Sequence, residues 1–141
     1  MLSKTALNAL KAFTVLADLP AGSYAGAGAI AEKIGAGQNY LGKLLQSLID
    51  QGLVTSQKGL GGGFRLTRKP QEITLYDVVE PIDHISRWEG CFMGRGECSE
   101  ETPCSVHDRW KRVRGEYLTF IKETTISDLI PRGQVRIAVL N

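Results

Sequence analysis

The stretch "GAGAIAEKIGAGQNYLGKLLQSLIDQGLV", residues 26–54, sets the architecture of this chain. It is typical of a short helix near Ala29–Ile34, a turn at Gly35–Gly37 and a longer helix from about Gln38 to Gln51. The apolar stripe of the longer helix is formed by Leu41, Leu44, Leu45 and Leu48. Two helices joined by a tight glycine-containing turn are the helix-turn-helix pattern, whose second helix enters the major groove of DNA. The residues of that helix expected to face DNA are Gln38, Asn39, Tyr40 and Lys43.

A hairpin is predicted after the longer helix. The run "LVTSQKGLGGGFRLTRKP", residues 53–70, gives two short strands around a glycine-rich tip, with Lys58 at the tip and Arg65 on the return strand. Gly59 and Gly61 allow positive φ and let backbone N–H groups approach a phosphate closely. A nucleotide-binding P-loop is excluded, because that motif needs Gly-Lys-Ser/Thr at the start of a helix and a strand follows here. Helix, turn, helix and basic hairpin together predict a winged helix.

The distribution of charge agrees with that prediction. The net charge of +2 divides into eight Lys/Arg against three Asp/Glu in residues 1–70, two against eight in 71–105, and seven against four in 106–141. Such patches are often ordinary solvated surface. A basic N-terminal half indicates nucleic acid binding when it lies on a scaffold that fits DNA.

The N-terminal segment predicts an amphipathic helix that ends before Pro20, with Leu7, Leu10, Phe13 and Leu16 or Ala17 on its apolar side. It lacks the apolar run and cleavage site of a secretory signal. No segment reaches the roughly 20 apolar residues of a membrane span. We therefore expect a cytoplasmic protein without membrane contact, in which disulfides are not structural staples.

All three cysteines lie in one loop, "CFMGRGECSEETPCSVH", residues 91–107, hereafter the cysteine loop. An odd number of thiols in one loop indicates that they bind a group or react. The spacing C-x6-C-x5-C lacks the paired short knuckles of structural zinc. Thiolates suit iron–sulfur clusters, and mixed Cys/His ligation of [2Fe–2S] is established chemistry. A cluster-free thiol sensor is the alternative.

The end of the cysteine loop predicts the start of a helix. Thr102 is expected as its N-cap and Pro103 as its first residue, so that Cys104 and His107 share one face. The helix N-terminus would favour an anionic thiolate cluster. Oxygen ligands in place of the histidine are offered by three acidic residues, Glu97, Glu100 and Glu101. His84 is expected to lie on the surface.

The predicted helix carries a nearly heptad apolar stripe, at Val106, Trp110, Val113, Tyr117 and Ile121. Burial against the chain's own domain is one reading of this stripe. We favour pairing with the same helix of a second subunit, with the interface at Trp110, Val113, Tyr117 and Ile121. Two recognition helices on a two-fold axis would then read a pseudo-palindromic operator. Trp88 and Trp110 flank the cysteines and are expected to shield them from water.

These motifs resemble the Rrf2 family of bacterial winged-helix regulators, which includes the iron–sulfur regulator IscR and the nitric-oxide-sensing repressor NsrR. The resemblance runs nearly end to end, through "LSKTALNALKA", "NYLGKLLQSLIDQGLV", "KGLGGGFRL", "ITLYDVVEPID", the three cysteines before "SVHDRW", and "TTISDL". Two departures stand out. Lys58 replaces the usual arginine of the wing, which loses the planar fork that reads guanine, and the first cysteine interval is longer.

The resemblance implies a cluster held by Cys91, Cys98, Cys104 and His107. IscR-like proteins complete a [2Fe–2S] site with a histidine three residues after the last cysteine, which is the position of His107. NsrR-like relatives take an acidic residue from the first helix, where "TALNAL" offers none. The resemblance therefore favours [2Fe–2S], with [4Fe–4S] as the second choice.

Together these observations predict a mainly α chain with a small β wing. Residues 1–80 are expected to form the winged helix-turn-helix, 81–104 the cluster-binding loop region, and 105–141 a dimerisation helix and tail. The expected function is that of a homodimeric, sequence-specific transcription regulator whose DNA affinity follows the cluster, in response to redox state, iron or nitric oxide. An enzyme is not expected, because no acid/base constellation is legible. The alternatives are a cluster-free thiol regulator, an electron-transfer iron–sulfur protein and a regulator that acts through a partner protein.

Overall fold

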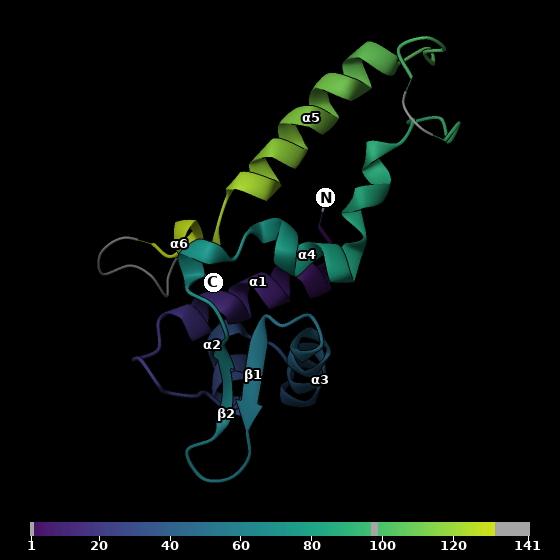
Figure 1. Ribbon diagram of the computed structural model, residues 1–141. Coiled ribbons are helices and arrows are strands. Elements are labelled where there is room, and N and C mark those ends of the chain that lie inside the picture. The colour runs from purple at the N-terminus through teal and green to yellow at the C-terminus, as the bar shows by residue number, and fades with distance from the viewer. Residues whose placement is uncertain (1, 97–98, 132–141) are drawn as a thin grey trace.

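The computed structural model describes residues 2–96 and 99–131, in which six α-helices, two strands and two 3-10 turns follow one another (Figure 1). Their order is α1 (Lys4–Ala17), α2 (Ala27–Ile34), α3 (Gln38–Ile49), β1 (Val54–Gln57), β2 (Gly63–Leu66), η1 (Pro70–Glu72), α4 (Leu75–Asp83), η2 (Ile85–Glu89), α5 (His107–Glu123) and α6 (Ile126–Leu129). The expected mainly helical fold with a two-stranded wing and a long C-terminal helix is confirmed.

Helix α1 is the centre of the fold, because α2, α3, α4, α6 and β2 all pack against it. Its start is capped by the Ser3 hydroxyl, which accepts the N–H of Ala6 at 3.0 Å. Small residues on its inner side let these neighbours come close, and Phe13 is fully buried among them. The expected apolar side was wrong at Leu7, which is 45% exposed. Ala6 and Ala9 occupy the inward positions of the first turns instead.

The helix-turn-helix forms where it was predicted. Gly35 ends α2 in the left-handed conformation with φ of 74°, which a side chain would disfavour, and α3 begins at Gln38. The four leucines of the predicted stripe are all buried: Leu41, Leu44, Leu45 and Leu48. The two helices lie close together where a Cβ on Gly42 would come within 3.6 Å of the Ala27 Cβ.

The wing is an antiparallel pair in which Val54 lies opposite Leu66. Ala25 forms a β-bridge with β2. Its backbone exchanges two hydrogen bonds with that of Phe64, at 2.7 and 2.9 Å. This contact explains Gly63, where a Cβ would lie 2.3 Å from the Ala25 carbonyl oxygen. The wing is therefore fastened to the segment before α2 by a bridge that the sequence did not indicate.

Helix α5 projects from the rest of the fold, as Figure 1 shows. The last turns of α5 pack into the core through Ile121. The segment that follows α5 pairs with the start of α4, where the Thr124 carbonyl accepts the N–H of Leu75 at 2.9 Å. The first turns of α5 carry the cysteine loop at the far end (Figure 1). Within the described ranges, no helix has the length and apolar character needed to cross a membrane.

Candidate DNA-binding surface and cysteine loop

The outward side of α3 carries the four residues expected to face DNA, and all are exposed: Gln38, Asn39, Tyr40 and Lys43. The Gln38 side chain lies along α2, with its amide group 3.2–3.4 Å from the position that a Cβ on Gly28 would take. The Tyr40 hydroxyl donates to Thr5 Oγ1 at 3.1 Å and accepts from Asn8 Nδ2 at 3.4 Å. Sequence reasoning missed these two contacts of α1 with α3.

The tip of the wing extends the same end of the molecule, opposite the free end of α5 (Figure 1). Lys58 is exposed, and Gly59 and Gly61 have φ of 95° and 78°, so the tip uses the backbone freedom expected of it. Arg65 does not extend freely, because its guanidinium lies over the Tyr24 ring, 4.6 Å from the centroid. Such a cation–π contact fixes the direction of the arginine fork.

In the cysteine loop, two of the three cysteines come together. The side chains of Cys91 and Cys104 lie near each other, because the Cys104 thiol is one of the groups that lower the pKa of Cys91, and neither cysteine is in a disulfide. The pKa of the Cys91 thiol is lowered, first by the backbone N–H of Arg95 and further by the backbone N–H of Met93 and the Cys104 thiol. Cys98, the third expected ligand, lies outside the described residues, as does Glu97.

His107 is the first residue of α5 and is buried, with 5% of its surface exposed. Its backbone N–H donates to the Cys104 carbonyl at 3.1 Å, so the two expected ligands are linked by one turn. Its Nε2 lies 3.4 Å from Glu100 Oε2. Glu100 also pairs with Lys111, and Lys111 and His107 hold the pKa of the Glu100 carboxyl below its ordinary value.

The expected start of this helix was wrong. The helix begins at His107 rather than Pro103, and Val106 precedes it without a side-chain cap. Thr102 does not cap it, because it lies five residues before the first residue of α5, in a local turn where its N–H donates to Ser99 Oγ at 3.3 Å. Cys104 therefore precedes the helix.

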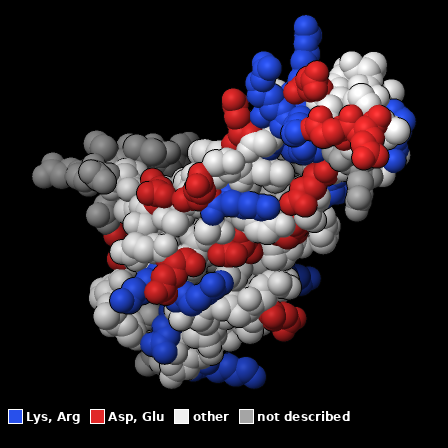
Figure 2. Space-filling model, turned by 45° about the horizontal axis from the view of Figure 1, so that its top comes forward, with Lys and Arg blue, Asp and Glu red and all other residues white. Residues whose placement is uncertain are grey.

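Trp110 borders the cysteine loop, as expected, whereas the ring contact of Trp88 is with α5. Trp110 donates its ring N–H to the Gly90 carbonyl at 3.0 Å and packs against Phe92, with ring centroids 5.4 Å apart. Trp88 packs against Tyr117, with centroids 5.0 Å apart. Phe92 is still 61% exposed, so this end of the molecule presents apolar as well as charged surface. Figure 2 shows acidic and basic side chains crowded together on the projecting upper end.

The donor atoms of a metal or cluster site are only partly assembled. Within residues 2–96 and 99–131, no three His, Cys, Asp or Glu side chains are grouped closely enough to hold a metal ion. The Cys91–Cys104 pair is the part of the expected ligand set that the fold brings together. Its two sulfurs and the buried imidazole at the adjoining turn are of the kind that a mixed Cys/His cluster requires.

The apolar stripe of α5 divides between two sides of the helix. Ile121 is 1% exposed in the core of its own chain, which corrects the expectation that it lies at a subunit interface. Tyr117 and Trp110 are half-buried by contacts within the chain. Val113 is 60% exposed and Phe120 56%, so the free apolar surface lies on the outward side.

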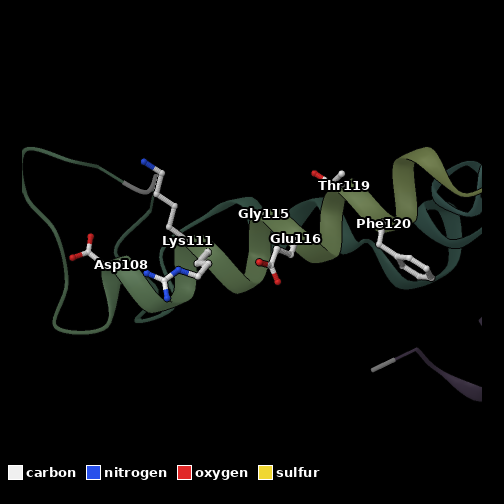
Figure 3. A pocket seen from close by; sticks show the side chains of 7 residues that line it. Asp108, Lys111, Gly115, Glu116, Thr119 and Phe120 are labelled. Atoms are coloured by element: carbon white, nitrogen blue, oxygen red, sulfur yellow. The ribbon is translucent and has the colours of Figure 1, made fainter.

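That outward side is hollowed around Gly115 (Figure 3). Asp108, Lys111, Glu116 and Phe120 are among the side chains that surround the hollow. A Cβ added to Gly115 would meet nothing in the described chain within 4 Å. A glycine in the middle of a helix costs about 1 kcal/mol relative to alanine, and no contact in the described part of the chain offsets that cost here.

A helix-turn-helix followed by a hairpin that flanks an exposed second helix defines the winged-helix class of proteins. Residues 2–132 match the Rrf2 family, described as an iron-dependent transcriptional regulator, and the chain therefore belongs to that family. Membership in a family of transcriptional regulators agrees with the expectation that it is not an enzyme.

Relatives and solved structures agree with this assignment. The chain is 38% identical over 93 residues to a protein of Aquifex aeolicus named as an HTH-type regulator, with 64% of this chain and 65% of that one covered. It is 30% identical over 106 residues to IscR of Vibrio atlanticus, with 75% and 61% covered. The matches thus span less than two thirds of the length of these curated relatives.

The fold is shared with CymR of B. subtilis, at a TM-score of 0.75 and 24% identity, over 92% of this chain and 95% of that one. It is also shared with IscR of T. potens, at a TM-score of 0.72 and 22% identity, over 92% and 85%. At these identities the likeness is one of fold.

Proposed function

We propose that this protein is a homodimeric, sequence-specific DNA-binding regulator whose affinity for DNA is controlled from the cysteine loop. The observation that carries the proposal is the Cys91–Cys104 thiol pair at the turn that starts α5. Thiols can react or bind metal, and the Cys104 carbonyl is hydrogen-bonded to the first residue of the long helix α5. The family to which the chain belongs supports a regulatory role.

The DNA contacts are assigned to two elements. Gln38, Asn39, Tyr40 and Lys43 of α3 are exposed and would enter the major groove, where amides can bond adenine bidentately. In the wing, backbone N–H groups at Gly59 and Gly61 and the side chains of Lys58 and Arg65 would contact phosphates. Contacts of the first kind carry sequence specificity, and contacts of the second kind carry affinity and register.

An iron–sulfur cluster is the proposed regulator of this affinity. Cys91, Cys98, Cys104 and His107 would hold it, and when bound it supplies a redox-active and labile group that joins the cysteine loop to α5. Relatives named IscR share 30% identity with this chain, which supports the assignment. His107 would have to turn from Glu100 to become a ligand, so Glu100 is the competing donor.

The dimer is proposed to form through the outward side of α5. Val106, Val113 and Phe120 are exposed at intervals of seven residues, the repeat of a helix that packs along another helix. Gly115 would let the partner helix approach closely at the hollow of Figure 3. Residues 107–115 hold four Lys/Arg and one Asp, whereas 116–123 hold one Lys and two Glu. An antiparallel crossing would therefore set unlike charges side by side.

A cluster-free thiol switch is the second candidate. The lowered pKa of the Cys91 thiol favours it, because the thiolate is the reactive form. Hydrogen peroxide would accept two electrons and both thiol protons from the pair, so that its O–O bond breaks to give two water molecules as the Cys91–Cys104 disulfide forms. A solved structure of the same fold is described as that of a global cysteine regulator.

Anaerobic purification followed by visible absorbance and iron and sulfide analysis separates the two candidates. Substitution of any one of Cys91, Cys98 or Cys104 by alanine should abolish the cluster spectrum, whereas Ser105→Ala should leave it intact. If two of the three cysteine variants keep a full spectrum, the cluster assignment is wrong. A protein without iron whose DNA affinity changes with peroxide and recovers with dithiothreitol would instead support the thiol switch.

The fourth ligand is tested by three variants, two at His107 and one at Glu100. His107→Cys should keep the cluster and lower its reduction potential, because a thiolate adds negative charge where imidazole is neutral. His107→Ala should leave a labile cluster or none, and Glu100→Gln should leave the wild-type half-life unchanged. The reverse result, with loss in Glu100→Gln only, would assign the fourth position to the carboxylate.

A further inference from the structure

A cavity of about 380 Å³ lies between the first turn of α1 and the start of α3, beside the surface proposed to bind DNA. Lys4, Thr5 and Asn8 line it from α1, and the turn at 35–37 and Tyr40 line it from the helix-turn-helix. None of the α1 residues was predicted to have a role in binding. An inference about this cavity rests on the proposal that α3 binds DNA.

The positive potential in the cavity comes from the start of α3 and from the side chain of Lys4. The N-cap of α3 is Gly37, which offers no side chain to the free N–H groups of the first turn. Lys4 is the first residue of α1, where a cation opposes the helix dipole, and neither first turn contains an acidic residue. The Lys4 side chain is exposed and lines the cavity, so its ammonium group is available to a ligand there.

Asn8 supplies a buried polar group. Its side chain is nine-tenths buried and lines the cavity, and its Nδ2 makes a long contact of 3.4 Å with the Tyr40 hydroxyl. Among residues 2–96 and 99–131, no group donates to its amide oxygen. Rotation of the amide would let the oxygen accept from Tyr40 and turn the NH₂ group into the cavity. The cavity would then be lined by donors.

We propose that this cavity seats a phosphate group of the DNA backbone, next to the bases that α3 reads. Lys4 supplies the charge, the N–H groups at the start of α3 supply directed donors, and the Asn8 amide, held by Tyr40, completes the seat. The chemistry would suit any phosphate oxygen, but the position beside Asn39 and Tyr40 favours the backbone of a duplex docked on α3. Helix α1 becomes a third DNA-contacting element, which fixes register without reading sequence.

The test uses the full-length chain and a fluorescein-labelled mixed-sequence duplex, with affinity measured over a range of salt concentrations. Lys4→Ala should weaken binding, and the slope of log K against log salt should become shallower by about 0.9, the value for one phosphate contact. Lys11→Ala is the matched control, since Lys11 lies on the same helix two turns on and does not line the cavity. Asn8→Asp should weaken binding further, because a carboxylate replaces the amide with almost no change of shape.

Titration of the ¹⁵N-labelled protein with inorganic phosphate separates the two sources of the ligand. The amide resonances of residues 38–40 should shift in wild type and not in Asn8→Asp. If Lys4→Ala binds the duplex as Lys11→Ala does, the seat is not used by DNA, even where phosphate shifts the amides. If wild type binds no duplex at low salt, the proposed function fails together with the seat. If wild type binds and Lys4→Ala loses nothing, only the seat fails.

Discussion

Ser3, the N-cap of α1, donates two hydrogen bonds to the carboxylate of Asp83 at the end of α4, from its backbone N–H at 2.9 Å and its hydroxyl at 2.5 Å. Two residues further on, Thr5 accepts a hydrogen bond from Tyr40 of α3. The first turn of α1 is thus fixed both to α3 and to the helix that leads through η2 to Cys91. This turn is a hydrogen-bonded connection between the helix that carries the proposed DNA contacts and the segment that leads to the cysteine loop.

Loss of the Ser3–Asp83 hydrogen bonds should lower the free energy of unfolding. Asp83→Ala should lower the free energy of unfolding by about 1 kcal/mol, because two hydrogen bonds are lost at a partly exposed position. In a double-mutant cycle with Ser3→Ala, the coupling energy in urea unfolding should reach about 0.5 kcal/mol. Glu72→Ala removes an exposed carboxylate elsewhere and should change little. Additive effects of Asp83→Ala and Ser3→Ala would show that the pair does not interact.

The lowered pKa of Cys91 predicts its reactivity in cluster-free protein. Its alkylation by iodoacetamide, followed by peptide mass spectrometry, should have a pH midpoint below that of the same thiol in urea-unfolded protein. Cys104→Ala removes one of the groups that lower the pKa of the Cys91 thiol and should move the midpoint upward. The sign follows from stabilisation of the thiolate by donors. Equal midpoints for folded and unfolded protein would contradict the assignment.

Variants of the DNA surface should fall into two groups. Lys58→Ala and Arg65→Ala should weaken binding to all sequences and flatten the salt slope by about 1 per contact. Gln38→Ala and Asn39→Ala should relax specificity in a selection of bound sequences. Gly28→Ala should relax specificity as Gln38→Ala does, although Gly28 is not a proposed DNA contact, because the added methyl would displace the Gln38 amide. Sequence-independent losses of the same size in all of them would refute the division.

The subunit interface is tested by two substitutions on the outward side of α5. Val113→Glu should give monomers in analytical ultracentrifugation, with poor affinity for a palindromic site. Gly115→Ala should favour the isolated helix by about 1 kcal/mol and yet weaken the dimer, because the methyl group would lie where the partner helix crosses. A Gly115→Ala protein that dimerises more tightly than wild type would place the crossing elsewhere.

The sequence predicted those elements whose pattern is local. The leucines at 41, 44, 45 and 48 recur at helical spacing, and the glycines of the wing mark its tip, so both were placed correctly. Leu7 was wrongly placed on the buried side because a large apolar residue dominates the periodicity and alanine contributes little to it. In the structure, the small residues Ala6 and Ala9 are buried instead, where neighbouring elements pack closely. Periodicity alone does not tell which apolar side a neighbouring helix will cover.

Other features depend on contacts between distant segments and leave no local signal. Ala25 pairs with Phe64 through its backbone alone, and Thr102 lies in a local turn, where its N–H donates to Ser99 Oγ, five residues before α5 begins. The burial of Ile121 depends on the return of α5 to the core. The three thiols marked the cysteine loop at once, but only the fold pairs Cys91 with Cys104.

The central claim is that the state of the cysteine loop sets the affinity for DNA. It is tested most directly by measuring the affinity of one anaerobic preparation for a selected binding sequence, first with its cluster, then after chelation and after reconstitution, beside Cys104→Ala. Wild-type affinity should change by roughly 5- to 150-fold on cluster loss, the usual range of allosteric coupling, and return on reconstitution. Cys104→Ala should not respond. A wild-type affinity that is the same in all three states would contradict the account.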